Sequence, residues 1–160
     1  MRVLGWFVLA LVCIGAPAPI AAQTQPPTDV ELKALGETAG ELEVCSAFFM
    51  VVATCIAPQE PKLASDYEAK GKTIGGLSFK LLENLGVSEE AISAQYKLYT
   101  NSMLNAMQKN CTNIAVLLQR YMNFCQRLSQ DADPRLKEWI ACFQTERQRS
   151  CGSPGLPGLP

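Results

Sequence analysis

Histidine is absent from this 160-residue chain, which removes the side chain that most often serves as a general base or a metal ligand. No Ser-His or Cys-His nucleophile pair can form, and neither a G-x-S-x-G motif nor a phosphate-binding glycine motif is present. Haem attachment through C-x-x-C-H is excluded as well. These absences predict a protein that is not an enzyme, and we expect neither a cofactor nor a metal site.

The chain also lacks a large excess of either charge and lacks strand-like patterns. The 14 basic and 15 acidic residues give a net charge of −1, which leaves no basic footprint for nucleic acid. No segment alternates polar and apolar residues convincingly, and no internal repeat is visible. With 48% hydrophobic residues, the composition is that of a globular protein. We therefore expect an all-α fold of one domain.

The first 22 residues have the layout of a secretory signal peptide. One positive charge, Arg2, precedes an uncharged apolar run, and small residues and prolines follow that run. We expect cleavage after Ala22, so that the mature chain begins at Gln23. Cleavage after Ala18 is the alternative, because it places alanine at both positions that the peptidase reads.

Two other interpretations of this N-terminus are less favoured. An uncleaved membrane anchor needs about 20 apolar residues, whereas this run is shorter and ends at Pro17 and Pro19. A bacterial lipoprotein would be acylated at Cys13, but Val12 stands where that signal requires a small residue. We expect a secreted or periplasmic protein without a stable membrane span after cleavage.

Cysteine usage supports the same compartment. Of the seven cysteines, Cys13 would leave with the signal peptide, and an even number in an exported chain predicts a disulfide framework. A structural zinc site is the alternative, but it would need four thiolates from distant segments, since no C-x-x-C pair exists. The six remaining cysteines are Cys45, Cys55, Cys111, Cys125, Cys142 and Cys151.

Helix geometry restricts how these cysteines pair. Cys45 and Cys55 would lie about 15 Å apart on one helix, which is too far for a disulfide. Cys111 and Cys125 would lie about 21 Å apart if one helix carried both. Two antiparallel helices would join Cys55 to Cys111 and Cys45 to Cys125, and would leave Cys142 for Cys151. Because the two spans differ, the helix would have to fray or tilt near Cys111.

Five helices are expected within residues 28–150, after a leader at 23–27 and before a disordered Pro/Gly tail at 151–160. The first begins after a Thr28 cap and runs to about Cys55, and its apolar second half predicts a place in the middle of the bundle. The second spans Pro61 to Asn84, and its three glycines leave a break in its middle possible. Gly86 is expected to end it.

The remaining helices carry apolar stripes at helical spacing. The third follows a Ser88 cap, and the fifth begins at Asp133-Pro134 and reaches about Arg149. A continuous third and fourth helix remains possible, because residues 110–113 contain no proline or glycine. The stripes are Ile92, Tyr96, Tyr99, Met103 and Ala106 in the third helix; Ile114, Leu117, Leu118, Tyr121, Cys125 and Leu128 in the fourth; and Leu136, Trp139, Ile140 and Phe143 in the fifth.

Several groups of residues invite a functional interpretation beside a plain structural one. Glu37 and Glu41, one helical turn apart, form the best carboxylate pair, but we expect two solvated acids. Asn110-Cys111-Thr112 matches a glycosylation acceptor. A basic set could form a surface for an anionic partner, but we expect ordinary solvated helix faces: Arg120, Arg127, Arg135, Lys137, Arg147 and Arg149. A second set could line a ligand cavity, but we expect ordinary core: Tyr96, Tyr99, Tyr121 and Met103.

These observations favour an exported binding or interaction protein without catalytic activity. Its partner would be another protein or a small ligand, and nucleic acid is not expected. The alternative is a small-ligand carrier with a cavity inside the helical bundle. An enzyme ranks third.

Overall fold

The structure, a computed structural model, describes residues 26–145 and residue 151. The expected signal peptide, residues 146–150 and nearly all of the tail lie outside the described residues. Within the described part the secondary structure is helical throughout, without strands, as the all-α prediction required. The elements are α1 (Asp29–Ile56), α2 (Pro61–Asn84), α3 (Glu89–Ala106), the short 3-10 helix η1 (Cys111–Asn113), α4 (Ala115–Gln130) and α5 (Asp133–Gln144).

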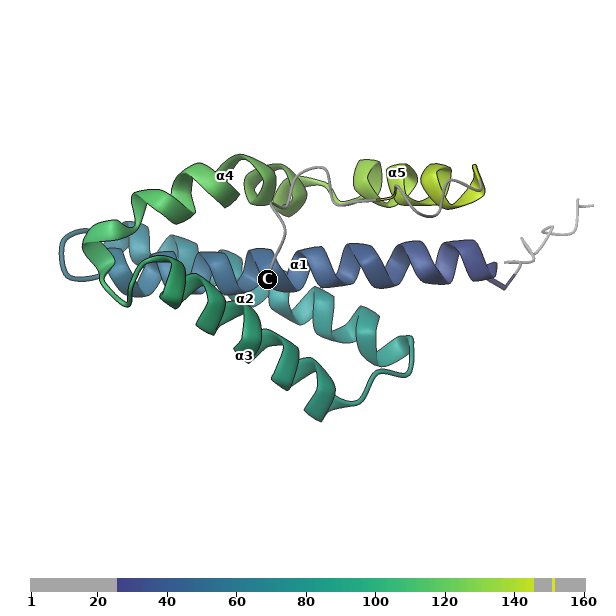
Figure 1. The fold of residues 1–160 in the computed structure, drawn as a ribbon, viewed down its shortest axis with the longest axis horizontal. Coiled ribbons are helices and arrows are strands. Elements are labelled where there is room, and N and C mark those ends of the chain that lie inside the picture. The colour runs from purple at the N-terminus through teal and green to yellow at the C-terminus, as the bar shows by residue number, and fades with distance from the viewer. Residues whose placement is uncertain (1–25, 146–150, 152–160) are drawn as a thin grey trace, which may run out of the picture.

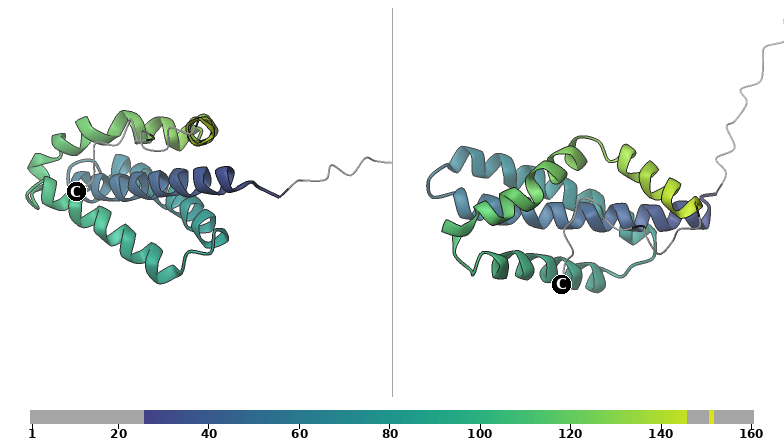
Figure 2. Two further views of the ribbon diagram at one scale, coloured as in Figure 1. Left: turned by 45° about the vertical axis from the view of Figure 1, so that its right-hand side comes forward. Right: turned by 45° about the horizontal axis from the view of Figure 1, so that its top comes forward.

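Helix α1 forms the centre of the molecule, and the other helices pack around it (Figure 1). Helix α2 lies antiparallel beside α1, α3 covers one side, and α4 and α5 follow each other along another (Figure 2). Residues 41–49 and 51–53 of α1 are buried, and Phe48 and Phe49 are fully enclosed. This placement confirms the prediction from its apolar sequence. By length and composition α1 could also cross a membrane, but most of it is buried within the bundle.

Local capping sets the ends of the first three helices. At the start of α1 the Thr28 side chain accepts a hydrogen bond from the Glu31 backbone, and the Glu31 carboxylate accepts one from the Thr28 backbone N–H at 2.7 Å. Ser88 caps α3 in the same manner, by accepting from the backbone N–H of Ala91. Gly86, with φ of 83°, follows the end of α2 in the left-handed conformation that glycine adopts without strain.

Helix α2 is continuous, so the break considered from its glycines does not occur. The glycines instead allow α2 to approach α1 closely. The Ser46 hydroxyl of α1 donates a hydrogen bond of 2.9 Å to the carbonyl of Gly71. A Cβ atom on Gly75 would lie 2.6 Å from the same hydroxyl oxygen, closer than real contacts permit. Packing against α1 therefore offsets the intrinsic cost of glycine in this helix.

We expect Gly75→Ala to lower the free energy of unfolding by about 1–3 kcal/mol, because the new methyl group displaces Ser46 from its hydrogen bond. Gly76→Ala is the matched control, since nothing lies within 4 Å of the added Cβ on that exposed neighbour. That substitution should be stabilising by about 0.5–1 kcal/mol through helix propensity. Urea denaturation followed by circular dichroism measures both. Equal effects of the two variants would contradict the close approach of α1 and α2.

The chain reverses direction between α3 and α4, so the single long helix considered above is wrong. Gln108 and Lys109 both adopt positive φ, at 54° and 56°, and end the helical path after Met107. Ala106, expected in the apolar stripe, is exposed, while Met107 is fully buried in its place. The turn carries Cys111 into η1, outside α4. The chain is therefore not in a regular α-helix at Cys111. Such a departure was expected there, because the separation of Cys45 from Cys55 differs from that of Cys111 from Cys125.

Three disulfides tie the helices together. Cys45 and Cys125 join α1 to α4, and Cys55 and Cys111 join the end of α1 to η1, each with a Cα–Cα distance of 5.2 Å. The third bond joins Cys142 of α5 to Cys151. These are the pairs expected from two antiparallel helices.

Helix α5 forms a second, smaller apolar cluster against the first half of α1. Trp139 and Phe143 stack with ring centroids 5.4 Å apart and pack on the fully buried Ala34. Asp133 is the first residue of the helix rather than its cap, and the helix ends at Gln144 instead of Arg149. An apolar face of α5 thus packs against α1.

Candidate functional site

The two carboxylates singled out from the sequence, Glu37 and Glu41, lie in different environments. Glu37 is exposed, as expected, but Glu41 is 3% exposed, so the expectation of two solvated acids is wrong for Glu41. Glu41 faces α5, and Arg135, expected on a solvated face, is buried against it. The Arg135 Nε and Nη2 groups donate to the two carboxylate oxygens at 2.8 and 2.6 Å. The pair is thus a bidentate ion pair between helices.

Further contacts complete this ion pair. The Trp139 indole N–H donates to Glu41 at 3.3 Å, and the Arg135 guanidinium lies 4.6 Å from the centre of the Trp139 ring. Arg135 also donates to Glu138 at 2.7 Å. Both oxygens of Glu41 are therefore engaged by donors, which suits a structural link between α1 and α5 better than proton transfer.

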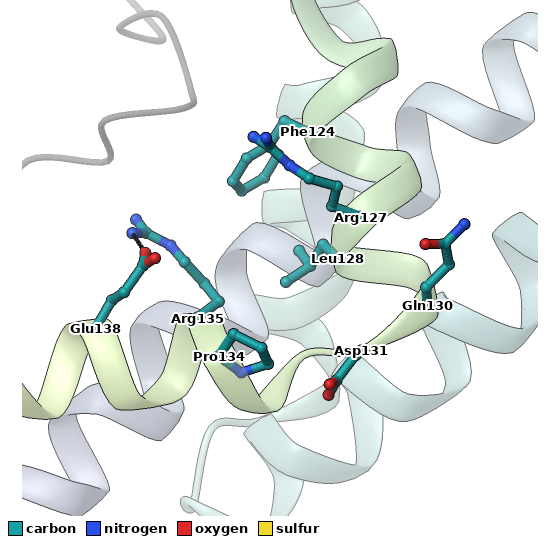
Figure 3. Close-up of a pocket in the computed structure, with 8 residues that line it drawn as sticks. All are labelled: Phe124, Arg127, Leu128, Gln130, Asp131, Pro134, Arg135 and Glu138. Atoms are coloured by element: carbon teal, nitrogen blue, oxygen red, sulfur yellow. Dashed lines mark hydrogen bonds and ion pairs between the residues drawn. The ribbon is translucent and has the colours of Figure 1, made fainter.

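A pocket of about 530 Å³ opens beside this ion pair, between α4 and α5 (Figure 3). Arg127 and Arg135 belong to its lining together with the exposed Asp131 and Glu138, so the pocket has charges of both signs. Lys137 is exposed, and Arg120 lies partly buried over the Tyr121 ring. Arg147 and Arg149 lie outside the described residues. The expected solvated faces are therefore present at Arg127 and Lys137 but not at Arg135.

A second pocket of about 320 Å³ lies between α1, α2 and α3, and it contains a buried carboxyl group that the sequence did not single out. Glu43 of α1 is 3% exposed and lies one helical turn before Ala47, on the helix that forms the core. The pocket is lined by Glu43 from α1, by Gly75, Ser78 and Phe79 from α2, and by Glu89, Ile92, Ser93 and Tyr96 from α3.

The Glu43 carboxyl lacks compensation in the part of the chain that the structure describes. Its Oε1 atom is buried and has no hydrogen-bond partner there. Burial raises the pKa of Glu43 from an ordinary 4.5 to about 7. The folded state therefore favours the protonated form, and the charged form costs stability as the pH rises through 7. A buried polar atom without a partner is uncommon in native proteins, and here it belongs to a residue that lines a pocket, which makes the pocket a candidate ligand site.

The lining of this pocket combines polar and apolar residues. The Ser78 hydroxyl is occupied, because it donates to the Ala39 carbonyl at 2.8 Å. Burial raises the pKa of Tyr96, and a hydrogen bond with the Ser46 side chain partly offsets that rise. Ile92 is buried, whereas Glu89 and Ser93 are exposed and mark the open side.

The aromatic and methionine residues considered as cavity lining are divided between two roles. Tyr96 packs half-buried against the main core, as expected, and it also lines the pocket. Tyr121 and Met103 belong to the main core, as expected, and Tyr99 packs against it half-buried. The sequence does contain a signal for Glu43. This acidic residue directly precedes the apolar run of α1, which is expected to be buried, so its carboxyl group is expected to be buried as well.

Among residues 26–145 and 151, no group of three or more acidic or cysteine side chains is placed to hold a metal ion. Asn110, in the possible glycosylation sequence, is exposed, but its neighbour Cys111 is bonded to Cys55.

No known protein family, curated protein or solved structure matches this chain. Its chemistry must therefore be inferred from its own side chains.

Proposed function

We propose that this chain is an exported, non-catalytic binding protein that holds a small ligand in the pocket between α1, α2 and α3. The observation that carries the proposal is that Glu43, one of the residues lining this pocket, has a buried Oε1 atom without a hydrogen-bond partner in the described residues. Leaving such an atom unsatisfied is costly, and a bound donor would remove that cost. The volume of about 320 Å³ falls at the lower end of the range for small-molecule sites.

Export is supported by the disulfides and by the signal-like layout of residues 1–22. Three cross-links join segments that include α1, η1, α4 and α5. Disulfides of this kind persist in oxidising compartments and are rare in the cytosol. A secreted or periplasmic location follows from this proposal.

The non-catalytic role is supported by the composition and by the ion pair. Without histidine, carboxylates are the remaining candidates for acid–base chemistry. Glu41 is held by Arg135 and Trp139, and Glu37 lies exposed on the same helix without joining it. Binding therefore accounts for the arrangement of Glu37 and Glu41 better than turnover does.

Native mass spectrometry of the protein purified from its source tests the proposal. We expect a small mass that stays bound under gentle ionisation and is lost on unfolding. Ser93→Trp places a bulky ring at the exposed side of the pocket and should remove that mass. Ala94→Trp, on the adjacent exposed position outside the lining, is the matched control and should retain it. A bound mass that Ser93→Trp leaves unchanged would place the ligand elsewhere.

A protein partner is the second candidate, and the pocket between α4 and α5 favours it. This pocket is larger, at about 530 Å³, and the exposed Arg127 side chain could receive an acidic group of a partner. In the same measurement, a retained polypeptide chain that Arg127→Ala releases would support this candidate over the small ligand.

A further inference from the structure

The pocket beside Glu43 has an unusual charge balance. Its lining contains two carboxyl groups, Glu43 and Glu89, and neither lysine nor arginine. Burial is the cause that raises the pKa of Glu43, without a compensating positive neighbour among the described residues. A ligand that enters this pocket therefore meets negative potential from one buried group and from one exposed group.

The chemistry that best satisfies such a site is a positive hydrogen-bond donor. A neutral donor would satisfy the Oε1 atom of Glu43, but it would leave the cost of the buried charge in place. A cation supplies both the donor and the countercharge. The rings of Phe79 and Tyr96 in the same lining add aromatic surface, to which ammonium groups are attracted.

An organic cation fits the lining better than a metal ion. Calcium and magnesium need about six or more oxygen ligands, and the two carboxyl groups here are accompanied by apolar side chains such as Ile92 and Phe79. Within the described residues no group of three acidic side chains gathers at any point. The apolar walls instead suit the hydrocarbon part of an amine.

We propose that this pocket binds a small organic ammonium ion, with its charged nitrogen against the Glu43 carboxylate and its apolar part against Ile92 and Phe79. The assignment rests on the proposed small-ligand function and specifies its ligand class. Glu89 contributes attraction at the open side, where solvent weakens it.

Proton binding gives this assignment a pH dependence. The titratable groups that face Glu43 are Glu89, Tyr96 and Tyr99, all from α3, while α2 contributes uncharged residues to the lining. Because the pKa of Glu43 lies at about 7, the carboxylate that binds the cation is scarce at pH 5.5 and predominant at pH 8. The apparent affinity for an ammonium ion should therefore rise about 30-fold between these pH values.

The test is a titration of the full mature protein, monitored by nuclear magnetic resonance, with three probes of similar shape. These are cyclohexylmethylammonium, cyclohexylmethanol and cyclohexanecarboxylate, and the amine keeps its charge over this pH range. We expect the amine to bind most tightly at pH 8 and to weaken about 30-fold at pH 5.5. Shifts should be centred on α1, α2 and α3.

Variants separate the two carboxyl groups. Glu43→Gln should weaken amine binding about tenfold or more and remove its pH dependence. Glu89→Gln should weaken binding about two- to fivefold, as expected of an exposed charge. Glu37→Gln, an exposed position on the same helix as Glu43, is the control and should leave binding unchanged. Thermal unfolding of each variant establishes that the fold is retained.

The outcomes distinguish the ligand class from the function itself. If the alcohol binds as tightly as the amine, or if Glu43→Gln binds the amine normally, the ammonium assignment is wrong although a small-ligand site remains. A calcium-induced shift at α1 and α3 that EDTA reverses, without an amine response, would assign the site to a metal ion and overturn the assignment. Failure of all probes, together with no retained mass in native protein, would overturn the proposed function as well.

Discussion

Arg135→Met is expected to lower the free energy of unfolding by about 3–5 kcal/mol. The substitution leaves the Glu41 carboxylate buried and takes away the two donors that now lie at 2.8 and 2.6 Å. The Trp139 indole alone, at 3.3 Å, does not replace them. Urea denaturation followed by far-ultraviolet circular dichroism measures the loss.

Two controls identify the buried charge as the cause. Glu41→Leu combined with Arg135→Met removes both charges and should recover most of the lost stability, because a buried ion pair is often matched by apolar residues. Lys72→Met breaks the exposed pair with Glu68 and should cost less than about 1 kcal/mol. An Arg135→Met variant as stable as Lys72→Met would show that Glu41 is solvated in the folded protein.

Removing the disulfide between Cys45 and Cys125 with two alanine substitutions should lower the free energy of unfolding by about 4.5 kcal/mol or more. This bond closes the longest loop of the three, with a sequence separation of 80, and so restricts the unfolded chain most. Both sulfur-bearing residues are fully buried, so the substitutions also remove core contacts.

The bond between Cys142 and Cys151 provides the comparison, since its sequence separation is 9. Its removal should cost about 2–3 kcal/mol under the same chain-entropy model. Denaturation of the two double variants under non-reducing conditions gives both values. Peptide mapping with thiols alkylated first checks the pairing, and a bond between Cys45 and Cys55 would contradict a continuous α1.

Local chemistry made the helix boundaries predictable. Three features set helix starts through contacts within a few residues: the Thr28 capping box, the Ser88 cap and the proline at the start of α2. Their effects can therefore be predicted without the rest of the fold. The second half of α1, which is apolar nearly all round, also predicted a central position. The length of a helix and the limited reach of a disulfide excluded bonds within one helix, and the pairing then followed from the expectation of two antiparallel helices.

The environment of each carboxylate was not predictable in the same way. Glu37, Glu41 and Glu43 lie within two turns of α1, yet one is exposed, one is paired with Arg135 and one lines a pocket. The environment of Glu41 depends on α5, and that of Glu43 depends on α3. Arg135, the partner of Glu41, is 94 residues away along the chain. Helical periodicity specifies which face a side chain occupies, but not which partner covers that face.

The sequence by itself determined the all-helical class, most helix ends and the absence of histidine chemistry, because these depend on residue type and on neighbours within one or two turns. The tertiary structure decided the continuity of α2, whose glycines are accommodated by contact with Ser46, and the reversal at Gln108 and Lys109. It also decided that Glu41 is paired with Arg135, while Glu43 has no positively charged neighbour among the described residues. These outcomes arise from close approach between segments distant in sequence, where packing and desolvation outweigh local preference.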